Sequence, residues 1–162
     1  MPATPPNTSQ KRTGEVSSDL SMAPGQGVGR AETFRIEQLM RQMPQVAVRV
    51  VEYFSKGVYA REIHIPKGTA LTGRIHKFAN LNILSQGDMS IKTDDGVLRI
   101  RAPYTVVSPP GTKRIAYAHE DCIWTTVHGT DQTDSDAIEE EFTTNSEQEY
   151  LSFVESLQIQ GV

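Results

Sequence analysis

Imidazole and basic side chains gather at two places along the chain. Arg74, His76 and Lys77 are near neighbours, and Arg114 precedes His119 by five positions. Arginine recognises carboxylate and phosphate groups through paired hydrogen bonds, whereas neutral imidazoles bind divalent transition metals. These residue types therefore indicate an anion site or a metal site. A third interpretation is a solvated sheet face on which basic and apolar residues alternate.

The composition excludes several classes of protein. The 162 residues carry 16 basic and 20 acidic side chains, for a formal net charge of −4. Such a balance disfavours a general nucleic-acid binder. We also expect neither a secretory leader nor membrane insertion, because no apolar run approaches the length of a bilayer span. Cys122 is the single cysteine, which excludes a disulfide framework and a cysteine-rich zinc site.

The charge is spread unevenly over the chain. Residues 1–30 have a net charge of +1 and residues 131–162 have −9, which leaves +4 for the middle. Half of the first thirty residues are Pro, Gly, Ser or Thr, and large apolar side chains are sparse there. Such a segment cannot offset its own ordering entropy. We therefore expect residues 1–32 to form a flexible arm that orders when it contacts a partner.

Helical periodicity occurs on both sides of the middle region. Residues 33–43 place apolar side chains on one face, with Thr33 as a possible N-cap and Pro44 as a stop, so we expect a short helix within 33–45. The acidic tail, residues 130–162, predicts a helix over 135–142. Ser146 to Glu149 has the spacing of a capping box and precedes a second apolar stripe, so a further helix is expected there.

Between residues 46 and 129 the apolar period changes to two, which is typical of β-strands. Turn signals separate the runs, among them Pro66–Gly68, Asp94–Gly96 and Pro109–Gly111. The expected strands occupy residues 46–50, 58–65, 70–77, 80–85, 89–93, 97–102, 104–108, 113–119 and 122–128. Eight or nine short strands with few intervening helices predict an all-β sandwich or barrel.

The segment from Gly68 to Gly87 resembles the first motif of the cupin superfamily, G(X)5HXH(X)3-4E(X)6G. His76 occupies the second histidine position, Arg74 replaces the first histidine and Asn80 replaces the glutamate. Pro109–Gly111 matches the PXG turn of the second motif, whose final histidine falls on Arg114. The resemblance covers about half of the chain. It implies an all-β, cupin-like jelly-roll barrel over residues 46–129. The short N-terminal helix and the C-terminal helices expected from periodicity are not part of the cupin pattern.

This resemblance implies two alternative sites inside the barrel. In a metal-binding cupin, His76 and, through an irregular strand, His119 would hold Fe, Mn, Ni or Zn. In the other alternative, basic side chains at the opening of the barrel would bind a small anion, and no cofactor would then be needed. The candidate ligand-binding residues are Arg74, His76, Lys77, Asn80, Arg114 and His119. We identify no catalytic residue, and Cys122, beside Glu120 and Asp121, has the setting of a packed rather than an activated thiol.

The runs VYAREIHIPKGTALTGRIHK and APYTVVSPPGTKRIAYAHED also resemble small cupin-like proteins of tailed bacteriophages. This likeness implies source and fold more than function. Together with the long arm, the altered metal motif and the opposite charges of the tail and the middle region, it favours a structural or assembly protein of the virion, associated with capsid or tail and built as an oligomer, with the N-terminal arm making subunit contacts. Other copies of the chain and other virion proteins would be its partners, and it would occupy the host cytoplasm before assembly. The alternative is a cytoplasmic cupin that binds a metal or a small anion, either as an enzyme or as a host-interference protein.

Overall fold

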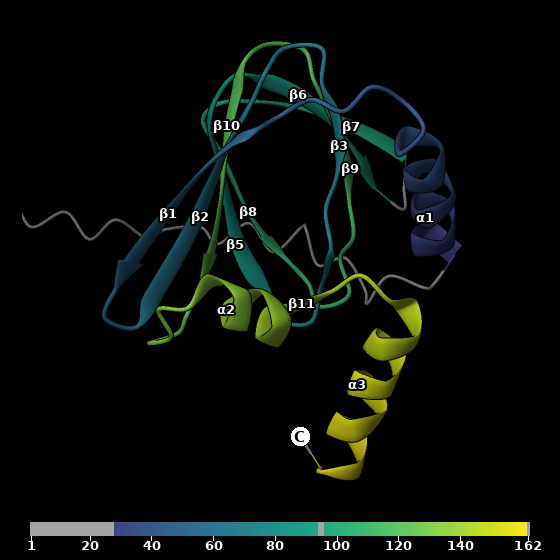
Figure 1. Cartoon of the computed structure of the whole chain (residues 1–162), viewed down its shortest axis with the longest axis vertical. Helices are drawn as coiled ribbons and strands as arrows, with labels where there is room; N and C mark the ends of the chain where they lie inside the picture. Colours follow the sequence, from purple (N-terminus) through teal and green to yellow (C-terminus); the bar gives the residue numbers. More distant parts are fainter. Residues whose placement is uncertain (1–27, 94–95, 162) are drawn as a thin grey trace, which may run out of the picture.

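Two antiparallel β-sheets face one another in the computed structural model, which describes residues 28–93 and 96–161 (Figure 1). The five-stranded sheet contains, in spatial order, β1 (Arg49–Ser55), β2 (Val58–Ile65), β10 (Cys122–His128), β5 (Asn80–Gln86) and β8 (Tyr104–Ser108). The four-stranded sheet contains β3 (Ala70–Thr72), β9 (Ile115–Ala118), β6 (Asp88–Thr93) and β7 (Gly96–Arg101). The expectation of a cupin-like jelly roll is confirmed by this two-sheet arrangement.

The core lies between the two sheets because alternate side chains of each strand point inward. Its buried members come from both sheets and are Ile65, Leu84, Met89, Ile91, Ile100, Ala118 and Cys122. The buried, packed position expected for Cys122 is thus confirmed, and burial raises the pKa of its thiol. This core occupies one end of the space between the sheets and leaves the other end to polar residues.

Two glycines of the predicted motifs are required by the backbone. Gly87, between β5 and β6, has φ of +94°, and a Cβ there would lie 2.5 Å from the carbonyl oxygen of Asp121. Gly111 has φ of +82°, and its Cβ would lie 2.6 Å from the hydroxyl of Tyr150. Any other residue would be strained in this left-handed region and would also clash. The turns are therefore set by close approach of distant segments.

Helix α1 (Val28–Met40) begins and ends earlier than the sequence predicted. Thr33 is not its N-cap, because its hydroxyl donates to the carbonyl of Gly29 within the helix, at 2.9 Å. The boundary of the expected arm at residue 32 is therefore wrong, since residues 28–32 belong to the helix. The rest of the expected arm, residues 1–27, lies outside the described residues.

Several strand boundaries also differ from the prediction. Strand β1 begins at Arg49, where its pairing with His64 begins, rather than at residue 46. The expected strand 70–77 is interrupted at residues 73–74, so that its second part, β4 (Ile75–His76), leaves the sheet of β3. It pairs instead with β11 (Thr143–Thr144), a short strand that the sequence did not predict.

The two C-terminal helices are confirmed. Helix α2 (Ser135–Phe142) has the predicted bounds, and Asp134 caps it by accepting a hydrogen bond from the Ala137 nitrogen. Helix α3 (Glu147–Ile159) is capped by Ser146, as the capping-box spacing indicated. Helix α2 lies across one end of the two sheets, whereas α1 lies beside the four-stranded sheet and α3 projects from the molecule (Figure 1).

Candidate functional site

A cavity of about 290 Å³ lies between the two sheets and extends to α2, which lines one end of it. Residues paired across neighbouring strands form successive levels of the cavity wall. At the end nearest α2, Tyr59 lies opposite His128, and Asn80 lies opposite Ser108. The next level contains Arg61, Thr126 and Asn82. Polar side chains therefore surround the end of the cavity that α2 covers.

A hydrogen-bonded network connects the polar residues of three strands. The Asn82 amide donates to the side-chain oxygen of Asn80 at 2.6 Å and to the Ser108 hydroxyl at 2.7 Å. The Thr126 hydroxyl donates to the Asn82 amide oxygen at 2.8 Å. Arg114 donates from Nη1 to the Ser108 hydroxyl at 2.6 Å. Neutral groups thus hold the Arg114 guanidinium at the cavity wall.

Among the described residues, Arg114 has no acidic partner. Neither Arg114 nor Arg61, which lines the same cavity, forms a salt bridge within residues 28–93 and 96–161. Burial lowers the pKa of Arg114, although a guanidinium stays protonated at neutral pH. A half-buried cation without a counter-ion is costly for the folded protein, and an anion entering the cavity would compensate it.

Two histidines form the second feature of the site. The rings of His76 and His128 are nearly parallel, with centroids 5.6 Å apart. Burial, followed by repulsion from His128, Arg114 and Arg61, lowers the pKa of His76 to about 4. Burial also lowers the pKa of His128. Nδ1 of His76 is buried and has no hydrogen-bond partner among the described residues, so it is available to a ligand.

Polar contacts between α2 and the sheets close the mouth of the cavity. Arg74 forms a salt bridge with Glu139 of α2 at 2.8 Å. Glu52 of β1 accepts hydrogen bonds from the Tyr59 hydroxyl at 2.5 Å and from Ser135 of α2 at 2.9 Å. Both carboxylates of the mouth therefore already have partners, and neither forms a salt bridge with Arg61 or Arg114 among the described residues.

These residues do not fit the divalent metal that a cupin motif implies. Such a site needs several imidazoles and a carboxylate that converge on one point. Here the motif positions hold Arg74, His76, Asn80 and Arg114, so one ligand position of four has a metal-binding residue. Within the parts of the chain that the structure describes, no group of three or more His, Cys, Asp or Glu side chains could hold a metal ion.

Four of the six expected site residues line the cavity: Arg74, His76, Asn80 and Arg114. Lys77 and His119 do not. Lys77 donates to the Glu140 carbonyl at 2.7 Å, and His119 contacts the Ser90 hydroxyl, also at 2.7 Å. The expected metal pair of His76 and His119 is therefore separated. Both residues lie just beyond the end of a strand, because β4 ends at His76, which lines the cavity, and β9 ends at Ala118, which is buried in the core.

Sequence reasoning missed the residues that complete the cavity wall, which are Tyr59, Arg61, Asn82, Ser108, Thr126 and His128. The sequence contained part of the information needed to identify these residues. Asn80 and Asn82 have the period of two expected when both side chains face one side of a strand. His128 and Thr126 show the same spacing in β10, but assigning that face to the interior requires the register with β2.

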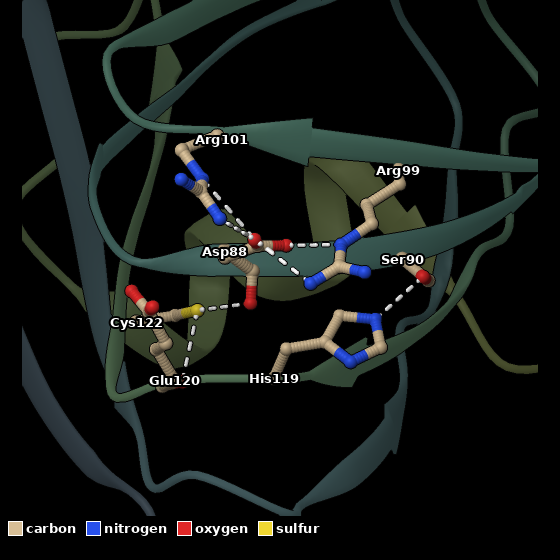
Figure 2. Close-up of polar contacts among 7 residues, drawn as sticks. All are labelled: Asp88, Ser90, Arg99, Arg101, His119, Glu120 and Cys122. Atoms are coloured by element: carbon tan, nitrogen blue, oxygen red, sulfur yellow. Dashed lines mark hydrogen bonds and ion pairs between the residues drawn. The ribbon is translucent and has the colours of Figure 1, made fainter.

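A separate charged cluster lies on the four-stranded sheet and is structural (Figure 2). The carboxylate of Asp88, which is buried, accepts hydrogen bonds from Arg99 at 2.8 Å and from Arg101 at 2.7 Å. These guanidinium groups hold the pKa of Asp88 well below its usual range. The Cys122 thiol contacts the backbone carbonyl of Asp88 at 3.4 Å. None of Asp88, Arg99, Arg101 and Cys122 lines the cavity.

Comparison with known proteins finds cupin domains of low sequence identity among the similar solved structures. No protein-family model and no curated protein matches the chain. A cupin domain from Bordetella pertussis is 13% identical, with 54% of this chain and 98% of that chain covered and a TM-score of 0.43. A cupin superfamily protein from Desulfitobacterium hafniense is also 13% identical, with 56% and 84% covered and a TM-score of 0.45.

An acetylacetone dioxygenase from Acinetobacter johnsonii is 13% identical as well. The match covers 52% of this chain and 61% of the dioxygenase, with a TM-score of 0.45. These similarities concern the fold alone. At the positions that resemble the cupin motifs, the cavity carries Arg74, Asn80 and Arg114 in place of metal ligands. Among the described residues, no helix combines the length and the apolar composition that crossing a bilayer requires.

Proposed function

We propose that the chain binds a small anion in the cavity between its two sheets. The observation that supports this function is the Arg114 guanidinium, which lines the cavity, is half-buried and has no acidic partner within the described residues. Arginine forms short, charge-assisted hydrogen bonds with carboxylates and phosphates. Asn80, Asn82 and Ser108 hold the guanidinium in place by a chain of hydrogen bonds, which reduces the ordering cost of binding.

The surrounding groups are consistent with an anionic ligand. Arg61 contributes a second cation from the facing part of the wall, and Nδ1 of His76 is an unused polar atom in the same cavity. Because both histidines have lowered pKa values, they are neutral at pH 7 and the arginines supply the charge. The ligand is thus recognised without a metal ion.

Anion titrations of the variant Arg114→Met test the proposal. Phosphate, acetate, benzoate and hexanoate are added to isotopically labelled protein, and the affinity of each is followed by NMR chemical shifts. We expect at least one of them to bind near His76 and Asn82. Arg114→Met should weaken that binding about tenfold or more, since charge-assisted hydrogen bonds contribute about 1.5–3 kcal/mol.

Arg49→Met is the matched control, because Arg49 is exposed on β1 and does not line the cavity. It should leave the affinity unchanged. The proposal is wrong if none of the four anions binds, or if both arginine variants weaken binding equally.

A second proposal is the virion role that the sequence favoured. Its support in the described residues is the outer edge of the five-stranded sheet, where Val50, Tyr53, Phe54 and Val58 are 41–50% exposed. Edge strands with exposed apolar side chains pair readily with other chains. Mass spectrometry of purified phage particles tests this role. If the chain is missing from particles whose known structural proteins are all detected, a virion role is excluded.

A further inference from the structure

The cavity has two chemically different halves. Below the polar level of Arg61 and Thr126, the register continues with Ile63 opposite Trp124. The four-stranded sheet adds apolar side chains from its inward face. The apolar half of the lining consists of Ile63, Ile65, Leu71, Met89, Ile91, Ala116 and Trp124. Moving away from α2, the wall therefore changes from polar and cationic to apolar.

The charges that line the cavity leave a single positive charge. The ionised side chains are three arginines (Arg61, Arg74 and Arg114) and two glutamates (Glu52 and Glu139). The two histidines of the lining are neutral at pH 7, and three positive charges less two negative charges leave one. A ligand with one negative charge would neutralise the cavity, whereas a dianion would leave an excess negative charge next to Glu52 and Glu139.

We propose that the ligand is an organic acid with one carboxylate and an apolar body. Its carboxylate binds Arg114 on the polar side, and its aliphatic or aromatic body lies against Ile63, Ile91 and Trp124. The inference rests on the anion-binding function proposed above and specifies the class of ligand. The cavity volume of about 290 Å³ restricts that class to small molecules.

Each half of the cavity disfavours one simpler class of ligand, either an inorganic anion or a neutral apolar molecule. A purely inorganic anion would pair with Arg114 but would leave the apolar wall in contact with water, without the gain from covering it. A neutral apolar molecule would cover Ile63 and Trp124 but leave the guanidinium without a counter-ion. A monocarboxylate with an apolar body would both pair with the guanidinium and cover the apolar wall.

A chain-length series tests the inference on the intact protein. Acetate, butanoate and hexanoate are titrated at pH 7, with hexan-1-ol as the neutral analogue and inorganic phosphate as the compact anion. Each buried methylene group should raise the affinity about fourfold. Hexanoate should therefore bind far more tightly than acetate or phosphate, and hexan-1-ol should bind at least tenfold more weakly than hexanoate.

The variant Ile63→Thr examines the apolar wall directly. It should weaken hexanoate binding about fourfold, the effect of about one methylene group. Val127→Thr is its matched control, because Val127 is a half-buried residue of β10 that does not line the cavity. The control should leave the affinity for hexanoate unchanged. The chain-length series on the unmodified protein decides the question even if Ile63→Thr does not fold.

The outcomes separate this inference from the function on which it rests. If binding depends on Arg114 but acetate or phosphate binds as tightly as hexanoate, anion binding stands and the organic-acid inference is overturned. Equal affinities for hexanoate and hexan-1-ol also overturn it. If no anion binds in a way that depends on Arg114, both proposals fail.

Discussion

Arg114 shows how a single residue type changes the chemistry of a cupin-like cavity. It occupies the position of a motif histidine, and its neighbours Ser108 and Asn82 offer it only neutral oxygen and amide groups. A neutral imidazole at this position could ligate a metal, whereas a guanidinium repels one and attracts an anion. The residue is thus better suited to binding than to stability, because its charge is uncompensated in the empty protein.

The first prediction follows from that uncompensated charge. Arg114→Met should leave the thermal unfolding midpoint of the ligand-free protein unchanged or raise it, because a buried charge is exchanged for an apolar side chain of similar length. Differential scanning calorimetry in a buffer without carboxylates or phosphate measures the effect. A fall of the midpoint by more than about 3 °C, or about 1 kcal/mol, would show that Arg114 stabilises the fold.

Asp88 gives a second prediction, on pH dependence. Its folded-state pKa is depressed by hydrogen bonds from Arg99 and Arg101. The stabilisation is therefore fully present at neutral pH. It is lost progressively below about pH 5, as the pH falls through the unfolded pKa of about 3.9 towards the depressed folded-state pKa. Asp88→Asn should lower the urea midpoint at pH 7 and flatten its dependence on pH below about 5.

Glu155→Gln is the control for that experiment, because Glu155 is exposed on α3 and forms no salt bridge with a described residue. It should leave both the midpoint and its pH profile close to those of the unmodified protein. If Asp88→Asn retains the steep loss of stability between pH 5 and pH 3, other carboxylates dominate acid unfolding.

At the scale of elements, local sequence signals predicted the C-terminal helices better than the N-terminal one. Asp134 and Ser146 have short side chains that cap the helix beginning next to them, so the information is local. The start of α1 depends instead on Arg30, which contacts Glu147 and the turn at Gly111. Such distant contacts leave no periodic signal in the sequence.

Helix α2 carries the third prediction, because it closes the polar end of the cavity. Ile138 and Phe142 are buried against the sheets, and the Asp134 side chain accepts a hydrogen bond from the Ala137 nitrogen at 2.9 Å. Asp134→Ala should lower the free energy of unfolding by about 1 kcal/mol, the usual cost of a lost N-cap. Urea denaturation followed by circular dichroism measures this change.

Asp134→Ser keeps a capping oxygen and should restore most of the stability lost in Asp134→Ala. Equal losses in the two variants would mean that the cap is unimportant and that packing of Ile138 and Phe142 alone holds α2 in place.

At the scale of the whole molecule, the sequence indicated the fold and four of the cavity residues but not the composition of the site. Arg74, His76, Asn80 and Arg114, which motif spacing indicated, all line the cavity, because each lies within a few residues of a turn whose position the sequence marks. His128 lies 52 positions after His76, and its inward orientation depends on strand register. A shift of one residue would reverse that orientation, so the sequence alone could not decide it.

The last prediction concerns the contact that joins the two ends of the described chain. Arg30 of α1 donates to both carboxylate oxygens of Glu147 at the start of α3, at 2.8 and 2.7 Å, and stacks over the ring of Tyr150. Arg30 is 8% exposed, so Glu147→Ala would deprive a buried cation of its carboxylate. We expect a loss of about 2 kcal/mol in the free energy of unfolding, reduced from the fully buried case because Glu147 is partly exposed.

A double-mutant cycle separates this pair from the packing around it. If the salt bridge is responsible, Arg30→Met combined with Glu147→Met should cost less than the sum of the two single variants, because each single change leaves one charge without its partner. Glu155→Ala, on the exposed side of the same helix, should change the free energy of unfolding by less than about 0.5 kcal/mol. Strict additivity of the two single variants would show that the Arg30–Glu147 pair is not what holds α1 against α3, and that other contacts of Arg30, such as its stacking on Tyr150, join the helices.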